Sequence, residues 1–331
     1  MIPAAAGLRG FMHDLTAVFT GTFPTSGDVI IVADDAFDPN QRQTNAVFSE
    51  KWQKYSQEEI RNQEKLFAFQ KNWYLDLYGF GTEAALQDFL KGRKAVLDAG
   101  CGLGYKAKWF ADLSPDTLVI GMDYSDAVFV AAATYRDTPN LVFAKGDIAV
   151  TRIREGALDY VSCDQVIHHT EDPKKTMMEL ARILEPGGEL AVYVYAKKAL
   201  PRELLDDYFR KRTSAVSSED MWAMSEQLTE LGKTLSELNI EVDIPDIPLL
   251  DIKGGRMDLQ RFIYWNFIKC FWNESLGRET SVSTNYDWYA PSNATRYSKD
   301  EFLAMTERCG LVASHLHTEE ACHSGRFAKP S

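Results

Sequence analysis

The residues best placed to do chemistry form a glycine-rich run, Asp98-Ala-Gly100-Cys101-Gly102-Leu-Gly104, which follows a short apolar stretch. Glycines let a backbone turn tightly and come close to a ligand, because no Cβ stands in the way. A helix that begins directly behind such a turn adds N–H donors aligned along its axis. The run therefore predicts a ligand-binding loop between a strand and a helix.

Asp98 discriminates between two kinds of ligand for this loop. The segment from Gly102 to Ala107 loosely matches the G-x-G-x-x-A spacing of dinucleotide-binding loops. A carboxylate at the end of the preceding strand would repel a pyrophosphate, whereas it would attract the ammonium of the methionine tail of S-adenosylmethionine. The loop therefore favours the methyl donor over a dinucleotide, and S-adenosyl-L-methionine is the expected cofactor.

Further polar residues follow the next apolar runs of the sequence. The predicted cofactor-binding set is completed by Cys101, Asp123, Tyr124, Gly146, Asp147, Ile148, Asp164 and Gln165. Asp123 is placed to hold the ribose hydroxyls in either cofactor class, and Asp147 to accept the adenine amino group. An acid after one strand is weak evidence, but acids at the ends of three successive strands indicate one binding site.

The elements that must position these residues alternate between strands and helices from Lys94 to Lys198. Strands are expected at residues 94–98, 117–122, 141–144, 158–163 and 189–195, and helices at 105–113 and 126–135. Asp172 and Pro173 predict the start of a third helix, which Pro186-Gly187-Gly188 is expected to stop. This order predicts a doubly wound α/β sheet, in which ligands bind at the carboxyl ends of the strands.

The sequence resembles the class I S-adenosylmethionine-dependent methyltransferases from about Leu90 to Tyr195, and weakly again from about Asp287 to the end. The runs that carry the resemblance are Val-Leu-Asp98-Ala-Gly-Cys-Gly-Leu-Gly, Gly-Met-Asp123-Tyr-Ser, Gly146-Asp147-Ile and Leu-Glu-Pro186-Gly-Gly. The resemblance implies a Rossmann-like, seven-stranded doubly wound sheet with one antiparallel strand. It also implies that Asp123 binds the ribose and Asp147 the adenine amine.

His168 and His169 are the candidate catalytic residues, since they lie just beyond the fourth expected strand. The run from Gln165 to Pro173 is similar to the family branch that acts on small molecules and often carries a histidine there. An acceptor atom that bears a proton needs a base, and an unperturbed imidazole titrates near pH 6.5. The alternative is that one histidine packs against the cofactor or caps the next helix, and the sequence does not separate the two.

Four parts are expected along the chain. They are an N-terminal extension and helical cap (1–91), a methyl-donor-binding core (92–198), a helical and aromatic substrate-binding insertion (199–290) and a return to the core sheet (291–331). An insertion of this length is usually functional, and pockets for small molecules are lined largely by aromatic and apolar groups. The candidate substrate-binding residues are Tyr195, Trp265, Tyr286, Trp288, Tyr289 and Arg296. The alternative is that the rings only pack and that Arg296 only forms a salt bridge.

Composition narrows the classes of partner. The 331 residues contain 36 Lys and Arg against 48 Asp and Glu, a net charge of −12, which argues against nucleic acid as the main ligand. The five cysteines form no C-x-x-C pair, so reduced thiols and no metal site are expected. No run reaches the roughly 18 apolar residues of a membrane span. We expect a cytoplasmic protein with a small-molecule substrate, and a homodimer is an open alternative.

The expected activity is methyl transfer to an oxygen or nitrogen atom of a small metabolite, with carbon as the next choice. One alternative is an enzyme that uses S-adenosylmethionine for another reaction, because the site and not the fold decides function. A second is a non-catalytic, cofactor-binding regulatory subunit. A third, a dinucleotide oxidoreductase, is disfavoured by Asp98.

Overall fold

The computed structural model describes residues 15–32, 38–56 and 60–331. The chain divides into two compact units. The first contains the described residues up to 38 together with 52–195 and 295–331, and the second contains 39–51 and 196–294. The predicted N-terminal extension, 1–91, lies partly outside the described residues.

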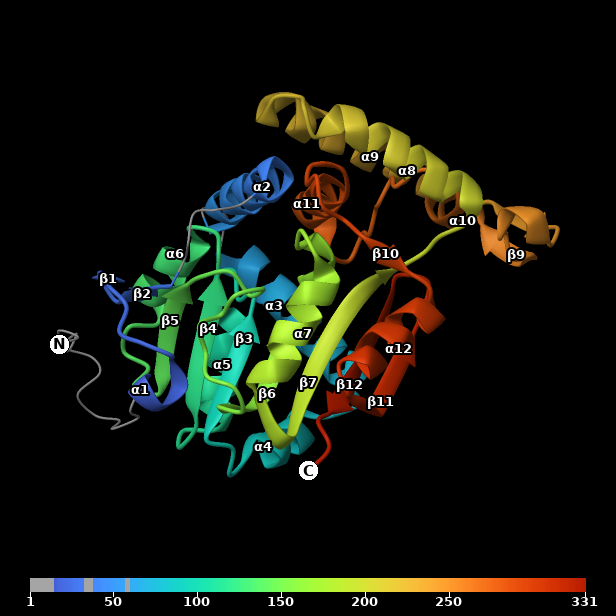
Figure 1. Cartoon of the computed structure of the whole chain (residues 1–331). Helices are drawn as coiled ribbons and strands as arrows, with labels where there is room; N and C mark the ends of the chain where they lie inside the picture. Colours follow the sequence, from blue (N-terminus) through green and yellow to red (C-terminus); the bar gives the residue numbers. More distant parts are fainter. Residues whose placement is uncertain (1–14, 33–37, 57–59) are drawn as a thin grey trace. The chain divides into compact units, whose positions relative to one another are not determined.

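The first unit is built on one sheet, whose strand order is β1-β2-β5-β4-β3-β6-β7-β12-β11, with β10 paired to β7 (Figure 1). The strands are β1 (Thr25–Ser26), β2 (Val29–Ile31), β3 (Ala95–Ala99), β4 (Leu118–Asp123), β5 (Leu141–Lys145), β6 (Leu158–Cys163), β7 (Leu184–Ala196), β10 (Arg296–Tyr297), β11 (Val312–Thr318) and β12 (Cys322–Ala328). From β5 to β11 the sheet has the seven strands that were predicted. Among these seven, β12 runs antiparallel to both its neighbours, which confirms the predicted topology. The short strands β1, β2 and β10 extend it.

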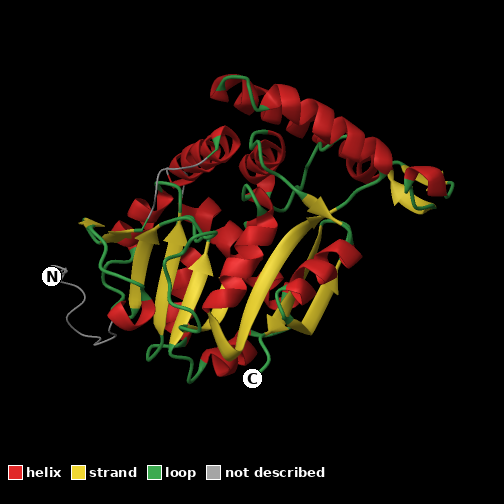
Figure 2. Ribbon diagram, in the orientation of Figure 1, coloured by secondary structure: helices red, strands yellow, loops and turns green. Residues whose placement is uncertain are grey.

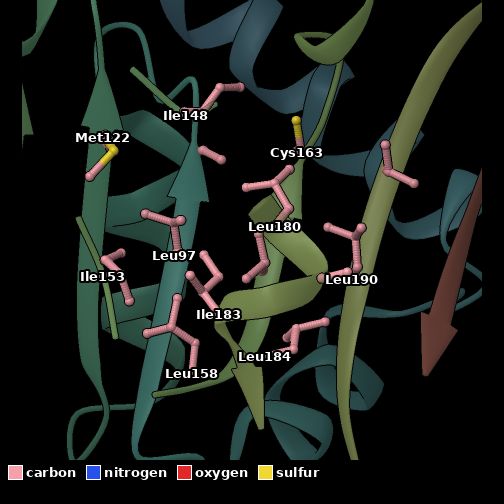
Figure 3. Packing of buried hydrophobic residues seen from close by; sticks show 14 of the residues in the cluster. Leu97, Met122, Ile148, Ile153, Leu158, Cys163, Leu180, Ile183, Leu184 and Leu190 are labelled. Carbon is pink, nitrogen blue, oxygen red and sulfur yellow. The ribbon is translucent and has the colours of Figure 1, made fainter. Parts of the chain in front are cut away.

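Helices cover both faces of this sheet, as the alternation of side chains along β3 shows. Ala95, Leu97 and Ala99 join one apolar core, and Val96 joins another. The helices of the unit are α1 (Leu15–Val18), α3 (Ile60–Leu77), α4 (Glu83–Leu90), α5 (Tyr105–Leu113), α6 (Ala127–Thr134), η1 (Ile167–His169), α7 (Pro173–Ile183) and α12 (Lys299–Arg308). Helices α7 and α12 pack on the face that bears Leu97, where Leu180 and Ile183 of α7 meet it (Figure 3). Helices α3, α4 and α5 pack on the other face.

Capping residues in the sequence fix where two helices begin. Asp172 caps α7 and accepts hydrogen bonds from the N–H groups of Lys174 and Lys175, with Pro173 at the first helical position. Ser298 and Glu301 form a capping box at the start of α12, as expected.

Helix α7 ends just before Pro186-Gly187-Gly188, as predicted, with Pro186 two residues beyond its C-cap. The next strand begins earlier than the predicted residue 189, because β7 starts with Leu184, which is fully buried and pairs with Leu158. The register of this pair shifts between Leu158 and Tyr160, which marks an irregularity of the kind a β-bulge makes.

The second unit is mainly helical, with one small hairpin that was not predicted (Figure 2). Its elements are α8 (Leu200–Thr213), α9 (Ser218–Glu237), β8 (Glu241–Ile244), η2 (Pro248–Leu250), β9 (Gly255–Asp258), α10 (Leu259–Asn266), α11 (Gly277–Tyr289) and most of α2 (Pro39–Ser56). Helix α2 is tied to α11 and to the residue that follows it. Gln43 Nε2 donates to the carbonyl of Ala290 at 2.8 Å, and Lys51 pairs with Asp287 at 2.5 Å.

The helices and the cysteines of the described residues relate to two predictions made from composition. None of their helices combines the length and the apolar character that crossing a bilayer would require. All five cysteines are free thiols.

The packing of α9 leads to a stability prediction at Gly232. A Cβ built there would lie 2.2 Å from the carbonyl oxygen of Cys270. Helix propensity alone would make Gly232→Ala stabilising by about 1 kcal/mol. The overlap involves rigid backbone, so we expect a net loss of about 1–2 kcal/mol in the free energy of unfolding, measured with urea.

Thr234→Ala, at an exposed position two residues further along α9, is the control. It should be neutral or gain a few tenths of a kcal/mol, about the propensity difference. A Gly232→Ala protein at least as stable as the wild type would show that α9 does not pack this closely.

Candidate functional site

The glycine run turns the chain from β3 into α5. Gly100 and Gly104 have φ of +80° and +76°, where side chains other than glycine are strained. Space also excludes a side chain, because a Cβ at Gly100 would lie 2.4 Å from Val166 and one at Gly104 would lie 2.7 Å from Phe143. The loop thus closes on the sheet as tightly as the sequence predicted.

Trp52 lies against the same loop. A Cβ at Gly102 would be 3.0 Å from its indole ring, which also contacts Tyr55 edge to face. Phe67 of α3 stacks on Tyr105, the first residue of α5, with 4.2 Å between ring centroids. Aromatic side chains from 52–77 therefore pack directly on the glycine loop and the start of its helix.

Behind the loop, three charged side chains are buried together. The ammonium of Lys106 lies 3.3 Å from Oδ1 of Asp98 and 3.2 Å from Oδ2 of Asp164. The side chains of the three residues are 7%, 0% and 5% exposed, respectively. Two carboxylates and one ammonium leave this group with a net charge of −1.

The partners of the two carboxylates differ. Asp164 also accepts a hydrogen bond from the hydroxyl of Tyr78, at 2.8 Å. Within the described residues, neither oxygen of Asp98 accepts a well-formed hydrogen bond, so its contact with Lys106 is ionic. A buried carboxylate with so few donors is costly, and Asp98 is the group in this cluster that a further cation would satisfy best.

Burial and charge shift the ionisation of this cluster. Burial raises the pKa of Asp98 to about 6, although Lys106 opposes the shift. Burial lowers the pKa of Lys106, but Asp164 and Asp98 together outweigh it, so the pKa is raised above its ordinary value. Lys106 therefore stays charged at neutral pH, while Asp98 gains a proton in mildly acidic solution.

Asp123 ends β4 and is tied to the glycine loop. Its Oδ2 accepts the N–H of Gly102 at 2.7 Å, and its Oδ1 accepts the N–H and the hydroxyl of Ser125 at 2.7 and 2.6 Å. Burial raises the pKa of Asp123, although these hydrogen bonds act in the opposite direction. The structure thus fixes the orientation of this carboxylate at the carboxyl edge of the sheet.

The other predicted cofactor residues lie at the same edge. Oδ1 of Asp147 accepts the N–H of Ala149 at 2.8 Å, and burial raises the pKa of Asp147. The ring of Tyr124, after β4, has the ammonium of Lys145 5.9 Å from its centroid. The remaining residues are Cys101 and Ile148, both buried, Gly146, and Gln165, which has φ of +62° after β6.

His168 and His169 are both buried in η1, and their surroundings differ. Nδ1 of His168 lies 3.4 Å from the carbonyl of Tyr193, its ring is 3.7 Å from that of Tyr195, and its Nε2 has no hydrogen-bond partner among the described residues. Burial lowers the pKa of His168 well below its ordinary value, and His169 lowers it further. His168 is therefore neutral at physiological pH. Nε2 of His169 lies 3.4 Å from the hydroxyl of Tyr195.

The predicted substrate residues fall in both units, and several are already engaged. Tyr195 lies beside the histidines at the end of β7, and Arg296 is half-buried in β10. In the second unit, Tyr286 stacks on Trp222 with 3.8 Å between ring centroids, and Trp265 is half-buried against Tyr264. Trp288 and Tyr289 both donate to Asp206, at 2.8 Å. A substrate role for these residues stays a prediction.

Lys106 is the residue of this site that the sequence reading missed. It is the second residue of α5, at the positive end of a helix dipole, where cations are disfavoured. That unfavourable position was the available signal. No group of three or more His, Cys, Asp or Glu among the described residues is arranged to hold a metal ion.

Comparisons with known proteins agree with this geometry. A family model described as a methyltransferase domain matches residues 97–192, which include the glycine loop and the ends of β3, β4, β5 and β6. Residues 97–192 thus form a methyltransferase domain of the class I S-adenosylmethionine-dependent type. The cofactor of this family is S-adenosylmethionine.

The matches to curated relatives cover only part of each relative's length. Trans-aconitate 2-methyltransferase of Deinococcus radiodurans is 35% identical over 101 residues, 30% of this chain and 38% of the relative. Ubiquinone biosynthesis O-methyltransferase of Coxiella burnetii is 24% identical over 197 residues, 56% and 79% of the two chains. The chain spans about a third of the length of the first relatives it matches (31–38%).

A solved S-adenosylmethionine-dependent methyltransferase from Aquifex aeolicus is 14% identical, with 77% of this chain and 92% of that one covered. The TM-score is 0.41.

The residues present fit the family's cofactor. The net charge of −1 behind the glycine loop suits the ammonium of the methionine tail, and Asp98 has oxygens that lack hydrogen-bond donors among the described residues. The Asp123 carboxylate, fixed by Gly102 and Ser125, retains lone pairs for hydroxyl donors.

Lys106→Met should destabilise the protein strongly. The change leaves Asp98 and Asp164 buried without their shared counter-ion, which typically costs about 3–5 kcal/mol. We expect a loss of that size in the free energy of unfolding at pH 8, and a partial recovery in the double variant with Asp98→Asn, which removes one of the two stranded charges.

Lys108→Met, two residues along α5, is the matched control. Lys108 is 30% exposed and pairs with the exposed Asp112, so its loss should change stability by less than about 0.5 kcal/mol. Equal losses for the two variants would contradict the assignment of Lys106 as a buried counter-ion.

Proposed function

We propose that this chain is a methyltransferase that transfers the methyl group of S-adenosylmethionine to an oxygen or nitrogen atom of a small-molecule metabolite, with carbon as the next choice. The observation that carries the proposal is the buried cluster of Asp98, Lys106 and Asp164 behind the glycine loop, with its net negative charge. The relatives named trans-aconitate 2-methyltransferase and ubiquinone biosynthesis O-methyltransferase support a small-molecule acceptor.

The chain's own residues divide the work of binding the donor. Asp98 and Asp164 neutralise the ammonium of its methionine tail, and Lys106 prevents the two carboxylates from accumulating a double negative charge. Asp123 accepts hydrogen bonds from the ribose hydroxyls, and Asp147 accepts one from the adenine amine, as the family resemblance implies. When bound, the cofactor supplies an electrophilic methyl group on a sulfonium.

His168 is the better base candidate of the two histidines. The carbonyl of Tyr193 faces its Nδ1, which favours the tautomer with a proton there and a lone pair on Nε2. That lone pair has no partner among the described residues. His168 is thus arranged to take a proton from a hydroxyl or amine as the acceptor atom is alkylated.

Other roles remain proposals of the same kind. Residues 199–290 supply the candidate substrate-binding side chains Trp265, Tyr286, Trp288 and Tyr289, and Tyr195 and Arg296 are the candidates outside this segment. A cytoplasmic location and a homodimer also remain proposals from the sequence. No observation favours nucleic acid as the acceptor.

Calorimetry with S-adenosylmethionine, S-adenosylhomocysteine and NAD tests the donor site. We expect micromolar binding of the first two and none of NAD. Because the pKa of Asp98 is about 6, the carboxylate that attracts the ligand ammonium is lost below that pH. Affinity for S-adenosylhomocysteine should therefore be about tenfold weaker at pH 5 than at pH 8.

Two controls isolate the ammonium contact. Methylthioadenosine, which lacks the methionine tail, should bind with little change over the same pH range. Asp98→Asn should weaken S-adenosylhomocysteine binding at pH 8 and flatten its pH dependence, while Asp112→Asn, at an exposed position in α5, should do neither. Tight NAD binding, or donor binding that is insensitive to Asp98→Asn, would overturn the assignment.

His168→Asn tests the base. The asparagine amide can still donate to the Tyr193 carbonyl but cannot accept a proton, so kcat with an acceptor found by screening should fall by about 100-fold or more. The Kd for S-adenosylhomocysteine should stay within about twofold. His169→Asn is the matched comparison, with an expected effect below about tenfold.

An unchanged kcat in the His168→Asn enzyme would show that His168 has a packing role and is not the base. If the wild type binds the donor but methylates nothing in a broad acceptor panel, the alternative of a non-catalytic regulatory subunit gains support.

A further inference from the structure

Lys106 can donate more hydrogen bonds than its two acidic neighbours accept. An ammonium carries three N–H donors, and among the described residues Lys106 makes one hydrogen bond, to Asp164 at 3.2 Å. Its contact with Asp98, at 3.3 Å, is an ion pair without a well-formed hydrogen bond. Because the side chain is buried and a buried donor without an acceptor is costly, this ammonium is suited to a further acceptor.

The start of α5 adds positive potential at the same place. Lys106 is the second residue of α5, at the positive end of the helix dipole. Gly104, the N-cap, offers no side-chain acceptor to the first N–H groups of the helix. Such groups are open to an anionic ligand. A carboxylate beside Lys106 would therefore meet an ammonium and aligned N–H donors together.

Asp98 presents the opposite charge next to this one. Neither of its oxygens accepts a well-formed hydrogen bond from the described residues. Asp98 lies on β3 just before the glycine turn, and Lys106 lies on α5 just after it. The loop that binds the donor is thus flanked by an acid and an ammonium 3.3 Å apart. A pair of opposite charges so close together suits an α-amino acid, whose ammonium and carboxylate are joined through one carbon atom.

Asp164 and Tyr78 hold Lys106 in this position. Asp164 accepts hydrogen bonds from Lys106, at 3.2 Å, and from the hydroxyl of Tyr78, at 2.8 Å. The ring of Tyr74 lies 5.5 Å from the ammonium. One carboxylate of the cluster is therefore engaged with the lysine, while the other, Asp98, is open to the ammonium of a ligand.

We propose that Lys106 binds the carboxylate of the donor's methionine tail while Asp98 binds its ammonium, so that the site recognises the tail as an amino-acid zwitterion. The proposal deepens the methyltransferase function and rests on it for the identity of the ligand. It gives a binding role to a lysine that otherwise acts only as a counter-ion. A tail that has lost either charge should then bind less well.

Calorimetry on the full chain at pH 8, with S-adenosylhomocysteine and two analogues that each lack one charge of the tail, tests the assignment. Decarboxylated S-adenosylhomocysteine keeps the ammonium, and deaminated S-adenosylhomocysteine keeps the carboxylate. We expect each analogue to bind at least tenfold more weakly than the parent compound. Equal affinity of the wild type for the parent and the decarboxylated analogue would overturn the proposal.

Variants of Lys106 show whether this residue causes the difference. In Lys106→Met the ratio of the two dissociation constants, decarboxylated analogue to parent, should fall from at least tenfold to about twofold or less. Because this variant is expected to be unstable, the double variant Lys106→Met, Asp164→Asn provides a second comparison. It removes one charge of each sign, so the cluster keeps its net charge of −1, and Tyr78 can still donate to the asparagine. The ratio should fall in the same way.

Two controls match these variants. Asp164→Asn alone retains Lys106 and should keep the ratio of at least tenfold. Lys108→Met, in the same helix, removes a lysine that pairs with the exposed Asp112, and it should also keep the ratio. If the Lys106 variants discriminate against the decarboxylated analogue as strongly as the wild type does, another group binds the carboxylate and the proposal is wrong.

The pH dependence of the deaminated analogue gives a second readout. Burial raises the pKa of Asp98 to about 6, and the charged groups around it are Lys106, Asp164 and Asp123. The pKa of Lys106 is raised by Asp164 and Asp98, so Lys106 stays charged. Protonation of Asp98 removes a repulsion for this analogue and leaves its attraction to Lys106. Its affinity should therefore not fall between pH 8 and pH 5, whereas that of S-adenosylhomocysteine falls; a parallel fall would contradict the proposal.

Binding of methylthioadenosine and S-adenosylhomocysteine, measured on the same preparations, separates the two levels of inference. If neither compound binds, the methyltransferase function itself fails. If both bind but the ratio does not respond to Lys106, the carboxylate contact alone is wrong.

Discussion

Burying a carboxylate in the middle of a sheet is tolerated only if the rest of the fold supplies a cation, and Asp98 on β3 imposes this condition on the first unit. Lys106, in the first turn of α5, supplies this cation. Its position requires the glycine turn to bring α5 back over β3. Asp164, directly after β6, shares the cation, and Tyr78, directly after α3, donates a hydrogen bond to Asp164. One ion cluster thereby ties two strands and two helices together and still leaves a charge of −1.

The second unit is centred on a buried acid of its own. Asp206 pairs with Arg202 and accepts hydrogen bonds from Trp288 and Tyr289, and so closes the centre of a helical cluster. The first unit, by contrast, keeps a buried negative charge in excess. Stability alone would remove that charge, because unpaired buried charge is costly. Its retention is the physical basis for assigning a cationic ligand group to the cluster.

Most of the first unit follows from local sequence. Runs such as 118–123 and 158–163 are buried on both faces, so they contain uninterrupted apolar residues, and the caps at Asp172 and Ser298 act within one turn. The role of Lys106 could not be derived in this way, because its partners lie 8 and 58 residues away. The same holds for the link between Gln43 and Ala290, 247 residues apart, and for the hairpin β8–β9. The early start of β7 at Leu184 could not be predicted either, because it depends on pairing with Leu158, 26 residues away.

The division of the chain has a consequence for its biosynthesis. The second unit takes 39–51 from one part of the sequence and 196–294 from another, and the sheet of the first unit is completed only by β12, which inserts between β7 and β11. Neither unit therefore has all its strands and helices until nearly the whole chain has left the ribosome. The edge of β7 stays without β12, and helix α9 without its neighbour α11, until late in synthesis. Apolar surface exposed for that time is prone to aggregation, so we expect the yield of folded protein to depend on the pace of late translation.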